Sequence, residues 1–262
     1  MTRETALYER DGAIVTITLN RPEKLNAFDD AAVEALSAAL ARFDTDPDAN
    51  VAILHGAGRA FSTGADVLRR QLRPREELER FGGPQGRGAD SGRLFTHAVN
   101  WKPVVAAVHG YVMGLAVGIA LDCDLLVAEA GTRFQITETS RGLGGSVYWG
   151  LMRLRGAGAF GDEVALTGCW FTAEEASAAG VINRLAPAGG HLEAARGLAE
   201  TLNANPPLSV RSTVRARRRE IARVRSELSA AAQPERLYLT EDFHEAALAF
   251  KEKRPPRPFR GR

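Results

Sequence analysis

Cysteine is scarce in this sequence of 262 residues, and its scarcity excludes one class of protein. The two cysteines, Cys123 and Cys169, are too few for a disulfide-rich secreted scaffold and favour a reducing compartment. The spacing of the cysteines and the five histidines matches no metal-binding pattern, so we expect no metal. The first residues carry no apolar leader ahead of small cleavage-site residues. Together these absences predict a cytoplasmic protein.

The sequence also lacks a large excess of positive or negative charge. Lysine and arginine number 34 and aspartate and glutamate 32, so the formal net charge is +2. A nearly neutral chain has no long-range attraction for nucleic acid, and we expect none as a partner. The basic stretch at residues 211–219 is interpreted as a solvated helix face, because Glu220 and later acids dilute it.

Long apolar runs are rare, and one of them needs care. Residues 104–121 are interrupted only by His109 and are just long enough for a membrane span. Their glycines even recur every fourth residue, as in helix-dimer motifs. However, the run begins with β-branched residues after Lys102 and Pro103, and two of its glycines lie at turn positions. We therefore predict a buried strand, a turn and a buried helix, and no membrane partner.

Hydrophobic residues make up 45% of the chain, which is enough for a sizeable core. We predict strands at residues 6–10, 13–19, 51–55, 104–108, 124–128 and 181–185, and helices at residues 29–43, 93–100, 114–122 and over most of the chain after residue 146. Residues 71–92 are polar and hold two prolines, which predicts a mobile surface segment or lid. Alternating strands and helices indicate an α/β fold with a mostly parallel sheet, followed by helices.

Two glycine-rich segments connect a predicted buried strand to a predicted helix start. They are residues 56–66 (GAGRAFSTGAD) and residues 109–118 (HGYVMGLAVG). Small residues let a ligand approach the backbone, and N–H groups at a helix start favour negative charge. Taken singly, each is an ordinary glycine-rich connection. Taken as a pair, they can supply the two donors of an oxyanion hole.

A third segment offers a carboxylate. Glu138 ends residues 134–138 (FQITE), shortly before the glycine turn at residues 142–146 (GLGGS). By itself this glutamate would be interpreted as a helix cap or a surface acid. The isolated histidines His55, His97 and His109 are interpreted as structural, and no nucleophile-elbow motif suggests a Ser-His-Asp triad.

Taken in order along nearly the whole chain, these segments resemble the crotonase (enoyl-CoA hydratase/isomerase) family. Further matches are residues 19–27 (LNRPEKLNA), 166–168 (LTG), 173–183 (AEEASAAGVIN) and 250–254 (FKEKR). The resemblance implies a ββα spiral over residues 1–200 that carries the acyl-CoA site, and a helical trimerisation region over residues 201–262. It implies an acyl-CoA thioester as substrate, no cofactor beyond the coenzyme A of that substrate, and a homotrimer or a dimer of trimers.

The resemblance also implies roles for individual residues. The N–H groups of Ala65 and Leu115 would bind the thioester oxygen, with Leu115 standing where a glycine is usual. Phe250 and Lys253 of a neighbouring subunit would close over the coenzyme A. The other residues implied to contact the substrate are Lys24, Leu25, Ala27, Ala60, Ser62, Asp66, Val67, Leu68, Gly114 and Gly118.

Departures from the family pattern bear on the reaction. Hydratases of the family use two glutamates; the second matches Glu138, but Gly118 stands where the first is expected. A single carboxylate suits a proton shuttle, so we favour isomerisation of an enoyl-CoA double bond. A hydratase in which Glu138 and an ordered water suffice stays open, as does a non-catalytic acyl-CoA-binding protein.

Three smaller departures concern the surroundings of the site. The turn after Glu138 lacks the usual proline, so the direction of this side chain is open. Nearby Tyr148 is of a residue type that more often packs in the core, although it or Ser146 could orient water or substrate. Leu68 stands where many relatives carry a lysine near the coenzyme A phosphates, and Arg69 or Arg70 is expected to replace it.

Overall fold

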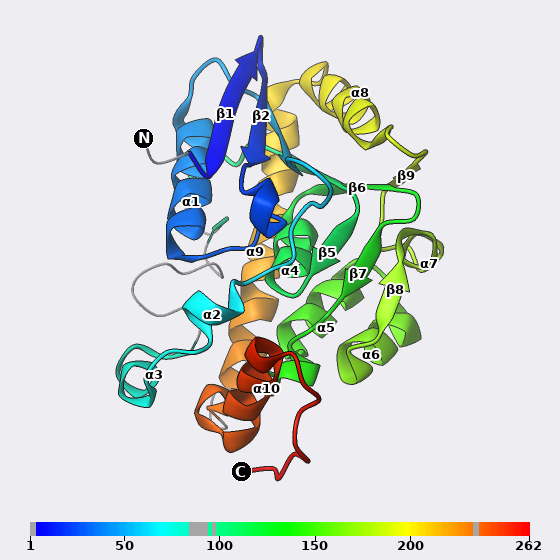
Figure 1. The fold of residues 1–262 in the computed structure, drawn as a ribbon. Helices are drawn as coiled ribbons and strands as arrows, with labels where there is room; N and C mark the ends of the chain where they lie inside the picture. The colour runs from blue at the N-terminus through cyan, green and yellow to red at the C-terminus, as the bar shows by residue number, and fades with distance from the viewer. Residues whose placement is uncertain (1–3, 84–93, 96–97, 233–235) are drawn as a thin grey trace.

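The computed structural model describes residues 4–83, 94–95, 98–232 and 236–262 (Figure 1). A six-stranded sheet in the order β1-β2-β3-β4-β6-β9 forms its centre, antiparallel between β1 and β2 and parallel elsewhere. Its strands are β1 Ala6–Asp11, β2 Ile14–Leu19, β3 Val51–Gly56, β4 Val104–Val108, β6 Leu125–Glu129 and β9 Arg184–Ala186. A second sheet has the order β5-β7-β8, with β5 Tyr111–Met113, β7 Arg133–Gln135 and β8 Trp170–Thr172.

Helices follow most of the strands, and of these α1 and α8 pack on the large sheet. The helices are α1 Asp30–Thr45, α2 Val67–Arg70, α3 Arg75–Phe81, α4 Leu115–Asp122, α5 Ser146–Leu154, α6 Gly158–Thr167, α7 Ala173–Ala178, α8 His191–Asn203, α9 Pro207–Ala232 and α10 Glu241–Glu252. Short 3-10 turns lie at Pro22–Lys24, Thr139–Arg141 and Leu237–Leu239. The pattern of strand, helix and mostly parallel sheet confirms the predicted α/β class.

Two hydrophobic layers explain why β4 is apolar throughout and β3 nearly so. Alternate residues such as Leu54 and Ala106 face the larger core, which α1 and α4 help to form. The residues between them, such as Ile53 and Val105, face a smaller core covered by α8. A parallel strand buried on both faces needs no polar side, so its sequence shows no alternation.

The hairpin and the helix predicted near the N-terminus are confirmed. Gly12 has φ 58° in the turn between β1 and β2, a backbone angle that glycine adopts without strain. Asp29 caps α1 by accepting a hydrogen bond of 2.9 Å from Ala32 N–H. The apolar run at residues 104–121 forms β4, β5 and most of α4. Within the described residues, no helix is long and apolar enough to cross a membrane.

Some predicted elements differ from the observed ones. The strands β5, β7 and β8 were not predicted, because three residues are too few to show periodicity. The strand expected at residues 181–185 lies at β9, and the segment expected to be a lid contains α3. Of the helix expected at residues 93–100, the described residues form turns and bends, and the rest lies outside the described part. The boundary predicted at residue 200 falls inside α8 and stays a prediction.

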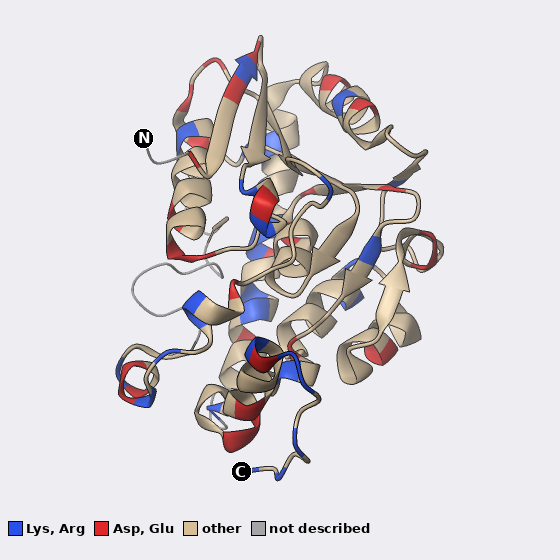
Figure 2. Ribbon diagram, viewed as in Figure 1, with Lys and Arg blue, Asp and Glu red and all other residues tan. Residues whose placement is uncertain are grey.

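The basic stretch of α9 was wrongly interpreted as a wholly solvated face. Arg218 is only 7% exposed, donates to Asp124 at 2.7 Å and also donates to the Lys102 carbonyl at 2.7 Å. Arg217 reaches the other oxygen of Asp124 at 3.2 Å. These contacts tie α9 to the sheet, whereas Arg223 pairs with acids on the helix surface. Figure 2 shows both charge signs interspersed along the C-terminal helices.

The stability of the fold should fall in mild acid because of His55. Burial and the nearby His109 and His191 lower the pKa of His55 from 6.5 to about 4, and its ring contacts Thr18 Oγ1 at 2.9 Å. Between these pH values the unfolded chain binds a proton that the folded chain does not, so stability is full above pH 6.5 and is lost toward pH 4. At about 1.4 kcal/mol per pKa unit, the loss is up to about 3 kcal/mol. Urea midpoints measured across this range should therefore decrease with pH, and a His55→Gln variant with an equally steep decrease would contradict this assignment.

Candidate active site

The segments that follow β3 and β4 run side by side beyond the carboxyl ends of those strands. Phe61 N–H donates to the His109 carbonyl at 2.9 Å, and Ser62 N–H donates to the Tyr111 carbonyl at 3.1 Å. Met113 N–H returns a bond of 3.1 Å to the Ser62 carbonyl. The two glycine-rich segments of the sequence are thus joined by backbone hydrogen bonds. The expectation that they meet at one site is confirmed for their backbones.

Two glycines bring these segments into close contact. Gly64 has φ 82°, and a Cβ added there would clash with the Met113 carbonyl and lie 3.2 Å from Leu115 N. Gly114 precedes α4 with φ 49° and ψ −121°, a conformation that is open essentially to glycine alone. Side chains at either position would therefore separate the two chains.

The N–H groups of Ala65 and Leu115 are left free by this arrangement. The hydrogen bonds on either side of Ala65 join Phe28 N–H to Gly64 O and Asp66 N–H to Phe28 O, both at 2.8 Å. Leu115 begins α4, where an N–H group has no partner within the helix. Within the described chain, neither group donates to another atom of the protein. Two unpaired backbone donors on touching segments are what an oxyanion hole requires.

Glu138 lies against the same glycine that precedes Leu115. A Cβ added to Gly114 would lie 3.1 Å from Glu138 Oε1 and 2.6 Å from Thr137 Oγ1. The carboxylate makes no capping bond to the 3-10 turn at Thr139–Arg141, although it stands at the cap position. Its Oε2 is buried and accepts no hydrogen bond within the described residues. The interpretation of Glu138 as a helix cap or surface acid is therefore wrong. Its side chain lies against Gly114, the residue before Leu115.

Burial and the polar neighbours of Glu138 shift its pKa in opposite directions. Burial raises the pKa of Glu138 because it penalises the charged form. Tyr148 donates a hydrogen bond of 2.7 Å from its hydroxyl to Glu138 Oε1, and this bond lowers that pKa, as does the positive charge of Arg141. A buried carboxylate with one stabilised oxygen and one unpaired oxygen is equipped to exchange a proton with a ligand.

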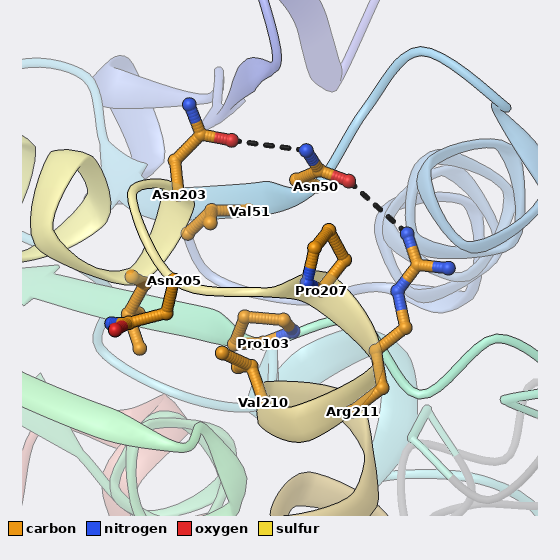
Figure 3. Close-up of a pocket in the computed structure, with 9 residues that line it drawn as sticks. Asn50, Val51, Pro103, Asn203, Asn205, Pro207, Val210 and Arg211 are labelled. Carbon is orange, nitrogen blue, oxygen red and sulfur yellow. Dashed lines mark hydrogen bonds between the residues drawn. The ribbon is translucent and has the colours of Figure 1, made fainter.

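A small cavity lies far from this site. Its lining comes from the amino ends of β3 and β4 and from the junction of α8 with α9 (Figure 3). Asn50 joins this junction by bonds of 3.0 Å to Asn203 and 3.1 Å to Arg211. The glycine segments follow the opposite, carboxyl ends of the same strands, so this cavity takes no part in the candidate site.

Comparison with known proteins gives these features a context. Residues 9–262 match the family model described as enoyl-CoA hydratase/isomerase. The chain belongs to the enoyl-CoA hydratase/isomerase family. It is 34% identical to a probable enoyl-CoA hydratase of Mycobacterium bovis over 98% of each chain, and 34% identical to the (E)-benzylidenesuccinyl-CoA hydratase of Thauera aromatica over 78% of each. The crystal structure of an enoyl-CoA hydratase from Mycobacterium tuberculosis H37Rv matches with a TM-score of 0.69 and 33% identity, covering 97% of this chain and 98% of the other. The protein is thus an enzyme of this family with the crotonase fold.

Several residues expected to contact the acyl-CoA lie together along one edge. The Pro22–Lys24 turn and the residues after it run against residues 60–66, because Thr63 N–H donates to the Leu25 carbonyl at 3.0 Å. Lys24 is exposed there, whereas Leu25 and Ala27 are half-buried and Ala60 is buried. The backbone places these residues beside the free N–H of Ala65.

Two of the expected contact residues use their side chains within the protein. Ser62 is buried and its hydroxyl donates to the Asn26 carbonyl at 2.8 Å. Asp66 caps α2 by accepting from Arg69 N–H at 3.2 Å. In α2, Val67 is half-buried and Leu68 is 55% exposed. These observations make Ser62 and Asp66 supports of the loop.

Asn26, which was not singled out from the sequence, organises the same loop. Its backbone has φ 54°, and its amide donates to the carbonyls of Ala57 and Ala60 at 2.9 Å each. Its Oδ1 accepts from Arg21 N–H at 2.8 Å. An asparagine four residues after the turn proline Pro22 is compatible with a left-handed backbone, which was the available signal.

Of the two arginines expected near the coenzyme A phosphates, Arg70 does not fit. Its side chain is 1% exposed and lies 3.7 Å from Asp30, so it points into the fold. Arg69 is exposed and stays a candidate. The carboxylate of Asp30 attracts Arg70 inward, an effect that the spacing of residues along α2 does not reveal.

The C-terminal helix lies beside the site of its own chain. Phe250 on α10 is 51% exposed, and the guanidinium of Arg141 lies 4.2 Å from its ring centre. Lys253 ends α10 and is exposed. A Cβ added to Gly142 would lie 2.9 Å from the Phe243 backbone, so the glycine in the turn after Glu138 lets α10 approach. Closure over coenzyme A by a neighbouring subunit stays a prediction.

Proposed function

We propose that the protein moves the double bond of an enoyl-CoA thioester by transferring a proton between two carbon atoms. The observation that supports this proposal is one carboxylate, Glu138, half-buried but with a buried and unpaired Oε2, beside the segments that carry two free backbone donors. Gly118, at the position where the resemblance places a second glutamate, has no side chain to offer. One carboxylate can take and return one proton, which is the requirement of an isomerase.

The proposed reaction begins with a β,γ-enoyl-CoA. Glu138 Oε2 takes a proton from the α-carbon, and the electrons of that C–H bond move toward the thioester oxygen to form a dienolate. The N–H groups of Ala65 and Leu115 bind this oxygen as its charge develops. The hydrogen that Glu138 now carries can exchange with solvent, and its return to the α-carbon reverses the first step. In the forward direction Glu138 delivers it to the γ-carbon, the double bond moves to the α,β position, and the enzyme is restored.

The site's electrostatics favour the dienolate. Each backbone donor to such an oxyanion contributes about 3 kcal/mol to transition-state stabilisation in comparable enzymes. Burial raises the pKa of Glu138 and so makes its carboxylate a stronger base than an exposed one. Coenzyme A enters as part of the substrate, and we propose no further cofactor.

A second candidate reaction is water addition to an α,β-enoyl-CoA. The names of the relatives from Mycobacterium bovis and Thauera aromatica favour it, since both are called hydratases. In that reaction Glu138 would activate water for attack on the β-carbon, and a proton would be delivered to the α-carbon. Since Gly118 carries no acid, one carboxylate and ordered water would have to serve both steps. A different class of function is acyl-CoA binding without catalysis.

A panel of enoyl-CoA thioesters in deuterated water separates these functions. We expect β,γ-enoyl-CoA to be converted to the α,β isomer with deuterium exchange at the α-carbon, and slow addition of water. Fast hydration without isomerisation would establish the second candidate in place of the first. Binding without exchange would indicate the non-catalytic class, and failure to bind any CoA thioester would contradict all three.

The quaternary structure and the location are proposals of the same kind. We propose a homotrimer or a dimer of trimers in the cytoplasm, as the family resemblance implies, with Phe250 and Lys253 reaching the coenzyme A of a neighbour. Sedimentation equilibrium should give a mass of three or six chains of 28.2 kDa. A monomer that turns over substrate would contradict the assembly and the shared site together.

A further inference from the structure

Tyr148 occupies the space that a side chain at position 118 would need. A Cβ added to Gly118 would lie 3.0 Å from Tyr148 Cε1 and 3.7 Å from both its Cζ and its hydroxyl oxygen. Gly118 lies on α4, one helical turn after Gly114, whose own space is limited by Glu138. The phenol therefore stands between the carboxylate that is present and the position where the second one is absent.

The hydroxyl of Tyr148 is committed to Glu138. It donates to Oε1 at 2.7 Å and leaves Oε2 as the unpaired oxygen. Burial, followed by the charge of Glu138, raises the pKa of Tyr148 well above its ordinary value, so the phenol stays protonated as a donor. The charged groups around the pair are Arg141 beside Glu138, and Asp122 and Arg225 beside Tyr148.

The position of Tyr148 is set by the packing of α5. This helix packs against both α4 and α9 (Figure 1). Gly150 on α5 leaves room for Leu228 and Val224 of α9, since a Cβ there would clash with both. On the far side, Asp122 of α4 and Arg225 of α9 form an ion pair of 2.5 Å. Three helices thus hold the ring in place beside Gly118.

We propose that Tyr148 is a positioning residue for Glu138, and that its ring, by filling the space beside Gly118, selects proton transfer within the substrate over addition of water. The inference rests on the proposed function, since it explains how one carboxylate is made sufficient. The hydrogen bond holds Oε1 and leaves Oε2 to exchange the proton. The ring crowds the position where a second acid would stand, because even the Cβ of such a side chain would lie 3.0 Å from Tyr148 Cε1.

Replacement of the hydroxyl alone tests the positioning role. The Tyr148→Phe variant keeps the ring and should lower kcat about 10- to 100-fold, the usual weight of a hydrogen bond to a charged group, with KM little changed. Without that bond the carboxylate is less stabilised, so the Glu138 titration should move to higher pH. This titration is followed in the unliganded protein by infrared difference spectra, with Glu138→Gln as the blank. Tyr8→Phe is the matched control, because Tyr8 also bonds a carboxylate, Asp46 at 3.2 Å, far from the site.

The titration of Glu138 and the thioester panel test different parts of the proposal. An unmoved Glu138 titration in Tyr148→Phe overturns the positioning role, whichever reaction the protein catalyses. The thioester panel on the unmodified protein decides the proposed function, and a hydratase result there overturns the selective role of the ring. A titration that moves in Tyr148→Phe but not in Tyr8→Phe supports the proposal.

The selective role of the ring has its own test. A Tyr148→Ala variant opens the space, and Gly118→Glu in the same chain supplies a second carboxylate. We expect the double variant to hydrate an α,β-enoyl-CoA at least about 100-fold faster than Tyr148→Ala alone, the lower end of the range for an added acid-base group. No gain in a folded double variant overturns this role, and the thioester panel on the unmodified protein tests it even if the double variant does not fold.

Discussion

Glu138→Gln should lower kcat about 1,000-fold on the best enoyl-CoA substrate, while KM stays within a few-fold of its original value. A positioned acid-base group contributes about 10²- to 10⁴-fold to the rate, and the Glu138 carboxylate lies against Gly114, the residue before Leu115. Glutamine keeps the size of the side chain and an oxygen that can accept from the Tyr148 hydroxyl. The loss should therefore report the missing proton transfer, and steady-state kinetics with purified protein measures it.

A second glutamate provides the control for this experiment. Glu174 also accepts a hydrogen bond, from Gly131 N–H at 2.8 Å, but it is exposed at the start of α7. Glu174→Gln should keep nearly full turnover. Equal activity of the Glu138→Gln and unmodified proteins would remove Glu138 from the mechanism and, with it, the proposed proton shuttle.

Gly64→Ala should lower kcat/KM by about 10²- to 10³-fold, the loss expected when an oxyanion donor is misplaced. The new Cβ would clash with the Met113 carbonyl and come within 3.2 Å of Leu115 N, so the loop at Ala65 must move away from α4. Movement of either segment separates the two N–H groups that face the thioester oxygen. Rates on one substrate at low concentration measure the effect directly.

An alanine at position 64 would also be strained by the positive φ there, and a control must separate this effect from the clash with Met113. Gly131 has φ 78°, close to the 82° of Gly64, but a Cβ added at Gly131 meets no atom within 4 Å. Gly131→Ala should thus cost only about 1 kcal/mol of stability, with activity retained. If both variants lose activity equally, or if Gly64→Ala stays active, the close approach of the two segments is not what aligns the donors.

Features that depend on neighbouring residues along the chain were predictable from the sequence. The turn at Gly12, the cap of α1 at Asp29 and the bounds of β4 followed from local backbone preferences. The two glycine segments and the family were likewise recognisable, because close approach of two backbones restricts which residues can stand there. The family match over residues 9–262 confirms that part of the prediction.

The state of the acid-base group depended on contacts between distant parts of the chain. The sequence placed Glu138 before a glycine turn, but only the fold surrounds it with Gly114 from α4 and Tyr148 from α5. The inward direction of Arg70 likewise depends on Asp30, which lies 40 positions earlier in the numbering and 3.7 Å away in space. Burial and hydrogen bonding are set by what packs around a group, and a linear pattern records only part of that.

The sequence by itself therefore determined the fold class and the family, and it indicated the two glycine-rich segments that meet in the fold, since these depend on glycines and caps that constrain the local chain. The tertiary structure alone decided that the space at Gly118 is filled by the ring of Tyr148, and that Glu138 keeps one oxygen unpaired. The physical reason is that α5 packs against α4 and so places Tyr148 beside Gly118. The side chain that position 118 lacks is thus replaced by one 30 residues later in the chain.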